Sequence, residues 1–230
     1  MTDKETVLVL RHQEDAGPGN LATWLDARRI PWRLVDVADG LPAPRPCRAL
    51  VVLGSRESVY DPAVPWVPDE RAFVREQLAL GTPVFGICFG AQLLAEVLGG
   101  EVRPAEAPER GWAEVKTSAG GALTDAIEGR WFEWHGDEIA APPGAAVLSA
   151  DRCVQAFVHG PHLGVQFHPE ITADQIRAWM ANDRRRRQLR EAGGEPEDLL
   201  LATEACDARA GEAAAGLYDA FFGMVRPSGQ

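Results

Sequence analysis

Hydrophobic and polar residues follow two different periods in the first half of the chain. Short and almost uninterrupted apolar segments at 6–10, 32–37, 49–53 and 82–87 predict buried strands. Segments at 20–29, 68–80 and 91–98 instead repeat their apolar residues every three or four positions, which predicts helices with one buried face. Because the two kinds of segment alternate, we expect an α/β fold: a three-layer, flavodoxin-like, doubly wound and mostly parallel sheet.

The pattern changes after residue 98. Short apolar segments separated by glycine and proline predict antiparallel strands added to the sheet, at 101–103, 113–116, 131–134, 146–149, 154–158 and 163–167. Further helices are predicted at 173–190, 195–208 and 211–225. Since no repeat or long linker divides the chain, we expect a single domain over 1–230, with a core at about 5–180 and a helical extension at 181–230.

Composition limits the classes of function. The 230 residues carry a formal net charge of −11 and contain no basic stripe, which argues against nucleic-acid binding. The basic run at 184–187 lies at the end of a predicted amphipathic segment and is interpreted as a solvated helix end, with a phosphate or partner contact as the alternative. No apolar run approaches the roughly 18 residues of a membrane-spanning helix, and the polar start of the chain argues against a signal peptide.

Cysteine usage indicates a reducing compartment. The four cysteines, at 47, 88, 153 and 206, show neither metal-ligand spacing nor the pattern of a disulfide framework. We therefore expect a cytoplasmic protein without a metal or an organic cofactor. An activated thiol would survive there, and one of the four cysteines stands in a context that suggests activation.

That cysteine lies in the segment Gly86-Ile87-Cys88-Phe89-Gly90, between a predicted strand and a predicted helix. The arrangement is typical of a sharp turn that lifts a nucleophile off the sheet and places it at a helix N-terminus. Glycines allow the close backbone approach that the bend requires, and the exposed N–H groups and helix dipole favour a thiolate. A buried cysteine that only packs beneath the turn is the alternative interpretation.

A histidine and a carboxylate end another apolar strand, in the segment Phe167-His168-Pro169-Glu170. A catalytic cysteine needs a base, and the base needs a partner that orients it. Residues i and i+2 of an extended chain project to the same side, and the carboxyl ends of parallel strands meet at one edge of a sheet. We therefore predict that Cys88, His168 and Glu170 meet in a catalytic triad, although a structural histidine is commoner.

The motifs GICFGAQ at 86–92 and FHPE at 167–170 resemble those of class I, or triad-type, glutamine amidotransferases. Single-domain members similar to the glutaminase domain of GMP synthetase are the most alike, with further matches at 59–61, 91–95, 99–100, 111–112 and 135–137. The resemblance implies that Cys88 attacks a γ-glutamyl amide, that His168 is the general base and that Glu170 orients it. It also implies a glutamyl thioester and the release of glutamate with ammonia or an amine.

The resemblance further implies roles for groups around the nucleophile. The N–H of Phe89 and the loop at Gly54 and Ser55 are expected to hold the oxyanion. The family usually has Gly-Gly-Pro in this loop, whereas this chain has Gly54-Ser55-Arg56, so Ser55 is either strained or in an ordinary conformation. Substrate-binding groups are expected one helical turn after the nucleophile and in a loop that the family places beside the substrate: Gln92, His135, Gly136 and Asp137.

Three functions remain open. The leading interpretation is a glutaminase that releases ammonia to a separate synthase or acceptor subunit. The second is a stand-alone hydrolase of γ-glutamyl peptides or amines, whose specificity would lie in its leaving-group pocket. The third is a catalytically quiet glutamine-binding or regulatory protein, which the Ser55-Arg56 departure favours and the complete set of Cys88, His168 and Glu170 argues against.

Overall fold

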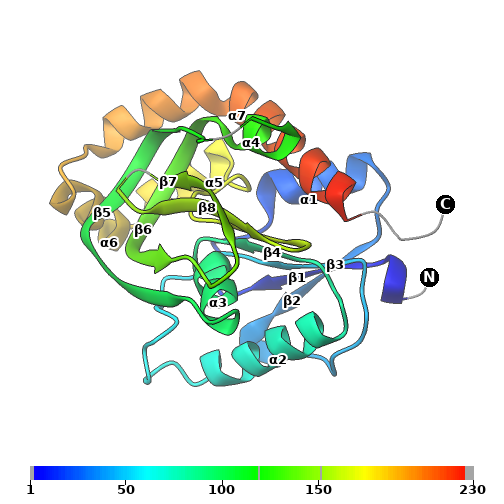
Figure 1. The fold of residues 1–230 in the computed structure, drawn as a ribbon. Coiled ribbons are helices and arrows are strands. Elements are labelled where there is room, and N and C mark those ends of the chain that lie inside the picture. Colours follow the sequence, from blue (N-terminus) through cyan, green and yellow to red (C-terminus); the bar gives the residue numbers. More distant parts are fainter. Residues whose placement is uncertain (1–2, 119, 151, 226–230) are drawn as a thin grey trace.

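A central sheet runs through the part of the chain that the computed structural model describes, residues 3–118, 120–150 and 152–225 (Figure 1). Its strands are β1 (Val7–Arg11), β2 (Trp32–Asp36), β3 (Ala49–Val52), β4 (Val84–Ile87), β7 (Ala146–Ala150), β8 (Val154–His159) and β9 (His162–Val165). They lie in the order β2-β1-β3-β4-β9-β8-β7. The strands from β2 to β9 pair in parallel, and β8 and β7 continue the sheet antiparallel. The expected doubly wound, mostly parallel α/β fold is therefore confirmed.

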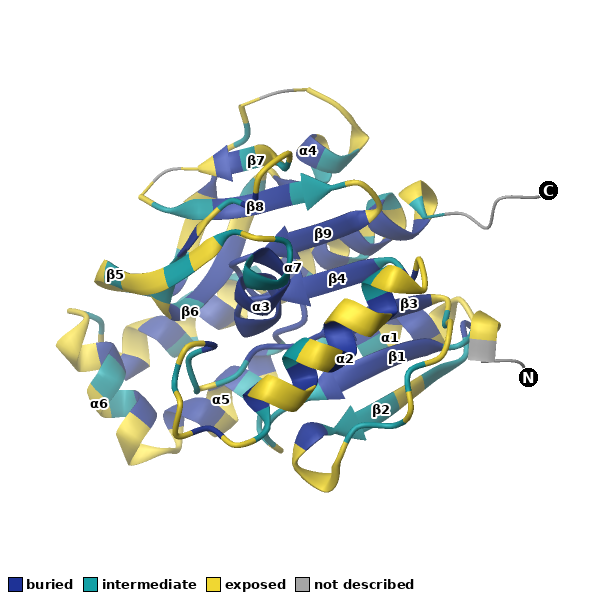
Figure 2. Ribbon diagram, turned by 60° about the horizontal axis from the view of Figure 1, so that its bottom comes forward, coloured by how far each residue is buried: buried dark blue, intermediate teal, exposed yellow. Residues whose placement is uncertain are grey.

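Helices cover both faces of this sheet. On one face lie α2 (Val67–Ala79) and α3 (Phe89–Val97), toward the viewer in Figure 2. The other face is covered by α1 (Gly19–Ala27), α4 (Ala122–Ile127) and α7 (Pro196–Met224). Short 3-10 helices, η1 (Asp3–Glu5) and η2 (Val37–Asp39), precede β1 and follow β2. No helix within the described residues is both long and apolar enough to cross a membrane.

The buried strands explain why the two helical layers form. Successive side chains of a strand point to opposite faces, so an entirely apolar strand supplies two cores at once. Val7 and Val9 of β1 pack in the cluster beneath α1 and α7, whereas Leu8 and Leu10 pack in the cluster beneath α2 and α3. The C-terminal half of α7 is thus part of the main core, and Tyr218 in it is fully buried.

Two strand predictions are wrong in detail. Instead of joining the central sheet, β5 (Glu101–Val115) and β6 (Gly129–Ala140) form a separate two-stranded antiparallel sheet, with an irregular register between Pro104 and Glu109. In addition, β9 pairs in parallel with β4 and only its pairing with β8 is antiparallel. Hydrophobicity alone shows that a segment is a strand, whereas its partner depends on where the chain returns in space.

Helix boundaries after residue 172 also differ from those predicted. The single helix expected at 173–190 is two helices, α5 (Ala173–Met180) and α6 (Asp183–Glu191), because the Asn182 side chain accepts from the N–H groups of Arg184 and Arg185 and caps a new helix. The basic run therefore lies near the N-terminus of α6 rather than at the C-terminal end of a helix. Conversely, the helices expected at 195–208 and 211–225 are one continuous helix, α7.

Candidate active site

Cys88 occupies the sharp turn between β4 and α3. Its backbone has φ 53° and ψ −109°, a strained conformation for a residue with a side chain. A Cβ on Gly90 would lie 2.0 Å from the carbonyl oxygen of Val52, and a Cβ on Gly86 would lie 2.4 Å from that of Gly90. Only glycine fits at these two positions, so the flanking glycines make the turn possible.

The His168 and Glu170 side chains meet directly after β9. Nδ1 of His168 lies 2.7 Å from Oε1 of Glu170, and both side chains are 5% exposed. The backbone N–H of His168 donates to Phe132 of β6, and the Asn20 N–H of α1 donates to the carbonyl of Glu170. The pair is therefore held between two distant parts of the chain and keeps a fixed orientation.

Cys88 and His168 border the same point of the loop after β3. A Cβ on Gly54 would lie 2.9 Å from Cε1 of His168 and 3.6 Å from Cβ of Cys88. Within the described residues, Nε2 of His168 has no hydrogen-bond partner, while the sulfur of Cys88 lies 4.0 Å from the carbonyl oxygen of Trp134. The imidazole thus has one nitrogen engaged by Glu170 and the other available beside the cysteine.

Electrostatics favours the charged form of this imidazole. Burial alone would lower the pKa of His168, but the electrostatic influence of Glu170 and then of Cys88 outweighs it and raises the pKa well above 6.5. Tyr218 of α7 is also buried, and burial, followed by the charge of Glu170, raises the pKa of its hydroxyl well above 10. Both partners of His168 therefore stabilise the imidazolium.

The loop expected to hold the oxyanion has ordinary backbone geometry. Among the described residues other than glycine, only Arg29 and Cys88 have a positive φ, so the strain considered for Ser55 is absent. The Ser55 hydroxyl accepts a hydrogen bond from the N–H of Glu57 at 3.2 Å, which closes a tight turn. Gly54 and Ser55 line the pocket, whereas the side chain of Phe89 is buried beneath the turn.

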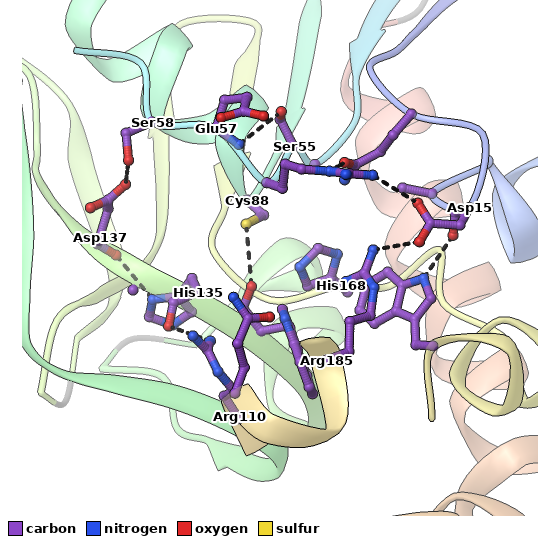
Figure 3. A pocket seen from close by; sticks show the side chains of 18 of the residues that line it. Asp15, Ser55, Glu57, Ser58, Cys88, Arg110, His135, Asp137, His168 and Arg185 are labelled. Carbon is purple, nitrogen blue, oxygen red and sulfur yellow. Dashed lines mark hydrogen bonds and ion pairs between the residues drawn. The ribbon is translucent and has the colours of Figure 1, made fainter. Parts of the chain in front are cut away.

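The predicted substrate-binding residues surround the same pocket, which Figure 3 shows from close by. Gln92 is 3% exposed, and its amide donates to Oε1 of Gln166 at 3.4 Å. The carboxylate of Asp137 accepts hydrogen bonds from the hydroxyls of Ser58 and Tyr60, both at 2.6 Å. The structure thus brings together the following predicted residues: Gly54, Ser55, Cys88, Gln92, His135, Gly136, Asp137 and His168.

His135 belongs to a buried charged network beneath the pocket. Its Nδ1 bonds to the carbonyl of Asp137, and its Nε2 lies 3.2 Å from Glu109 and 3.3 Å from Glu133. Burial opposes the charge, but these two carboxylates raise the pKa of His135 to about 10. Glu109, His135 and Cys153 each offer one ligand atom within 4.8 Å of the others, so they are the group of described residues that could approach a metal ion.

Several residues of the pocket escaped prediction because distant segments supply them. They are Gln13, Asp15, Arg110, Trp179 and Arg185. Of these residues, only Arg185 stood in a segment that the sequence analysis had singled out, the basic run at 184–187. Its charge suggested a solvent-exposed side chain, whereas that side chain is only 11% exposed. Trp134 of β6 also lines the pocket, whereas Trp131 of the same strand stacks on Phe167 in the core.

Fold and site together define a class of protein. It is a doubly wound α/β protein in which the sharp strand-to-helix turn that carries Cys88, called the elbow below, lies beside a buried histidine–carboxylate pair. The family model for class I glutamine amidotransferases matches residues 40–184. The chain therefore belongs to the class I glutamine amidotransferase family, as the motifs indicated.

Solved structures and curated sequences agree with this assignment. A glutamine amidotransferase from Methylobacillus flagellatus superposes with a TM-score of 0.88 at 25% identity, covering 99% of this chain and 98% of that chain. One from Thermotoga maritima gives 0.86 at 26% identity, covering 99% and 100%. The glutamine-hydrolysing GMP synthase of Thermomicrobium roseum is 40% identical over 129 residues, which are 54% of this chain and 23% of that protein. The chain thus matches about a quarter of the length of such synthases.

Proposed function

We propose that this protein is a cysteine-dependent hydrolase of γ-glutamyl amides, with glutamine as the simplest substrate. The observation that carries the proposal is the 2.7 Å contact between His168 Nδ1 and Glu170 Oε1, directly beside the elbow that presents Cys88. The pocket that contains Cys88 and His168 also contains Gln92 and Asp137, which are suited to an α-amino acid.

In this mechanism Glu170 holds the Nδ1–H of His168, so that Nε2 exchanges the proton. Cys88, as the thiolate, attacks the γ-carbonyl carbon of the substrate. The raised pKa of His168 supports this step, because it favours an imidazolium beside a thiolate. The N–H groups of Phe89 and Ser55 would stabilise the oxyanion that forms.

Collapse of the oxyanion breaks the C–N bond and leaves a glutamyl thioester on Cys88. His168 gives its proton to the departing nitrogen and then takes one from a water molecule. That water attacks the thioester, and glutamate leaves as the thiolate is restored. Gln92 and the 135–137 segment would hold the α-amino and α-carboxylate groups of the glutamyl part throughout.

If glutamine is the substrate, the ammonia needs an acceptor enzyme. The GMP synthases that the chain resembles are named as glutamine-hydrolysing enzymes, and the chain matches 23% of the first of them. We infer that a separate synthase or acceptor subunit would use the ammonia. We also place the protein in the cytoplasm, where the free thiol of Cys88 would stay reduced.

A chloroketone analogue of glutamine tests the proposal. It should alkylate Cys88 in the intact protein, and mass spectrometry of peptides should find Cys47, Cys153 and Cys206 unmodified. Cys88→Ala should lose hydrolysis of glutamine and γ-glutamyl amides while it keeps the unfolding temperature of the parent protein. Labelling of another cysteine, or full hydrolysis by Cys88→Ala, would exclude the mechanism.

A further inference from the structure

Side chains that can bind a metal ion gather where the two-stranded sheet meets the central sheet. Glu109 of β5 lies opposite His135 of β6, and Glu133 precedes His135 by two positions on the same strand. β6 packs against β8, and Cys153 directly precedes β8 (Figure 2). Three segments of the chain therefore supply the cluster, which is why the spacing of the cysteines along the sequence shows no metal motif.

The ring of His135 has the orientation of a metal-binding imidazole. Its Nδ1 lies 3.0 Å from the carbonyl oxygen of Asp137 (Figure 3). A carbonyl oxygen only accepts, so Nδ1 carries the proton. Metal-binding histidines commonly make such a bond to the backbone, because it fixes the tautomer whose other nitrogen can bind the ion. The nitrogen that faces the cluster is therefore Nε2.

Two carboxylates converge on this nitrogen. Oε2 of Glu109 lies 3.2 Å from Nε2 of His135, and Oε2 of Glu133 lies 3.3 Å from it. A bare nitrogen lone pair facing two carboxylates would be repelled by both. Nε2 must therefore hold a positive partner, which is either a second proton or a metal ion.

Glu133 gives an independent reason to expect a metal ion. Its side chain is 1% exposed, and neither of its oxygens has a hydrogen-bond partner within the described part of the chain. Burial is the main reason why the pKa of Glu133 is raised. Buried carboxylates are normally hydrogen-bonded, paired or bound to a metal. One N–H at Nε2 of His135, which bonds to Glu109, leaves this second carboxylate without a hydrogen bond.

Cys153 adds a thiol to the two carboxylates and the imidazole. One ligand atom each of Glu109, His135 and Cys153 lies within 4.8 Å of the other two. Gln155, which is 5% exposed, spans two of them: its Nε2 donates to Oε2 of Glu109 at 2.8 Å and lies 3.5 Å from the sulfur of Cys153. Such hydrogen bonds hold metal ligands in place in known metal sites.

Zinc matches these donors and their separations. Zinc binds imidazole, thiolate and carboxylate at about 2.0 to 2.3 Å, whereas calcium and magnesium prefer oxygen. A tetrahedron with bonds of that length has edges of about 3.3 to 3.8 Å. The 3.2 Å between His135 and Glu109 is already close to such an edge. Cys153 would need to approach by about 1 Å or less, which rotation about its χ1 bond can supply.

We propose that Glu109, His135 and Cys153 bind a zinc ion, with Glu133 as the nearest group for the fourth position. The ion would join the two-stranded sheet to the central sheet. Cys153 binds as the thiolate and His135 as the neutral ring, so each gives up one proton as zinc enters. In the protein without metal, His135 keeps its second proton. Because His135 also lines the pocket beside Cys88, zinc would hold that wall in place.

Metal titrations of the full chain, purified without a histidine tag and treated with EDTA, test the site. About one cobalt ion per chain should bind and produce the absorption of tetrahedral cobalt bound to a thiolate, and zinc should abolish that absorption. Zinc at about 100 times its Kd should raise the unfolding temperature by about 5 to 10 °C. If neither the absorption nor the rise is seen, the cluster holds only a proton and the proposal is overturned.

Variants locate the ion. Cys153→Ser should lose the sulfur-to-cobalt absorption and bind zinc at least about 100-fold more weakly, and Glu133→Gln should bind it about tenfold more weakly. Cys206→Ser is the matched control, because Cys206 is also partly exposed but lies on α7, outside the cluster. Unfolding temperatures in EDTA verify that all three variants fold. Equal zinc affinity in Cys153→Ser and Cys206→Ser would overturn the proposal.

A last variant separates this site from the proposed triad, which also contains a thiol and an imidazole. Cys88→Ala should bind cobalt and zinc as the parent protein does. Loss of the cobalt absorption in Cys88→Ala would assign the ion to the triad and overturn the proposal. The hydrolase is tested by alkylation of Cys88, which does not depend on zinc, so either proposal can fail while the other stands.

Discussion

The Nδ1 atom of His12 lies 3.0 Å from the carbonyl oxygen of Gly54, the residue that borders both Cys88 and His168. A carbonyl oxygen only accepts, so Nδ1 must carry the proton. Because the carbonyl and the N–H of one trans peptide point in opposite directions, this bond directs the Ser55 N–H away from His12. His12 thus fixes the peptide that is proposed to stabilise the oxyanion.

Replacing His12 should therefore weaken catalysis more than binding. In His12→Ala the peptide after Gly54 loses its anchor, and kcat should fall about 10- to 100-fold with little change in KM. His12→Asn should lose less, since its amide can still donate near the position of Nδ1. Steady-state kinetics and thermal unfolding of both variants check this, and equal kcat values in the two variants would argue against an orienting role.

Glu170 should control the protonation of His168. Glu170→Gln removes a negative charge that raises the pKa of His168, so the imidazole should lose its proton at a lower pH than in the parent protein. NMR titration of the imidazole nitrogens measures this shift in pKa. In the same variant kcat should fall by about 100- to 10,000-fold, as in other triads whose acid is made neutral. A titration curve that does not move would contradict the proposed ion pair.

Loss of the proton from His135 should make the protein less stable in alkaline solution. Its pKa is raised from 6.5 to about 10, so its contribution to stability is complete below pH 6.5 and is lost as the pH rises toward 10. The free energy of unfolding should decline in that range with a slope of up to about 1.4 kcal/mol per pH unit for this proton. In His135→Gln the decline should be shallower, with the part due to His168 remaining. Urea unfolding at several pH values measures the slopes.

The elbow should not tolerate a larger residue at position 90. Gly90→Ala would place a Cβ 2.0 Å from the carbonyl oxygen of Val52, and forced backbone shifts of this kind cost about 1 to 3 kcal/mol or more. Gly216→Ala in α7 is the matched control, because no atom lies within 4 Å of the added Cβ and alanine favours a helix by about 0.5 to 1 kcal/mol. Thermal unfolding of the two variants should shift in opposite directions.

Local patterns were sufficient for the sheet and for the elbow. The strands β1 to β4 are short and mostly apolar, and the turn at Cys88 is encoded by two glycines within five residues. Asn182 shows where such reasoning ends: it caps α6 through its side chain, but nothing in the surrounding helical pattern required an interruption there. Conversely, the boundary expected between the helices at 195–208 and 211–225 falls inside α7, which packing against α1 and α5 keeps continuous.

The pocket was less predictable than the residues beside Cys88. Arg185 has the composition of a solvent-exposed residue, and its burial depends on Trp179 from α5 and on Asp15 from the loop after β1. Likewise, Arg110 and Trp134 meet because β5 and β6 pair in a register that the sequence does not encode locally. Side chains drawn from five segments become neighbours only in the folded chain.

The burial of Tyr218 has a consequence for the order in which parts of the fold form during synthesis. This tyrosine belongs to α7, which leaves the ribosome after Cys88, His168 and Glu170 have all been made. Until α7 docks, the sheet face that carries Phe85 is open to water. Translation must therefore pass the last turns of this helix before that face of the sheet can be covered.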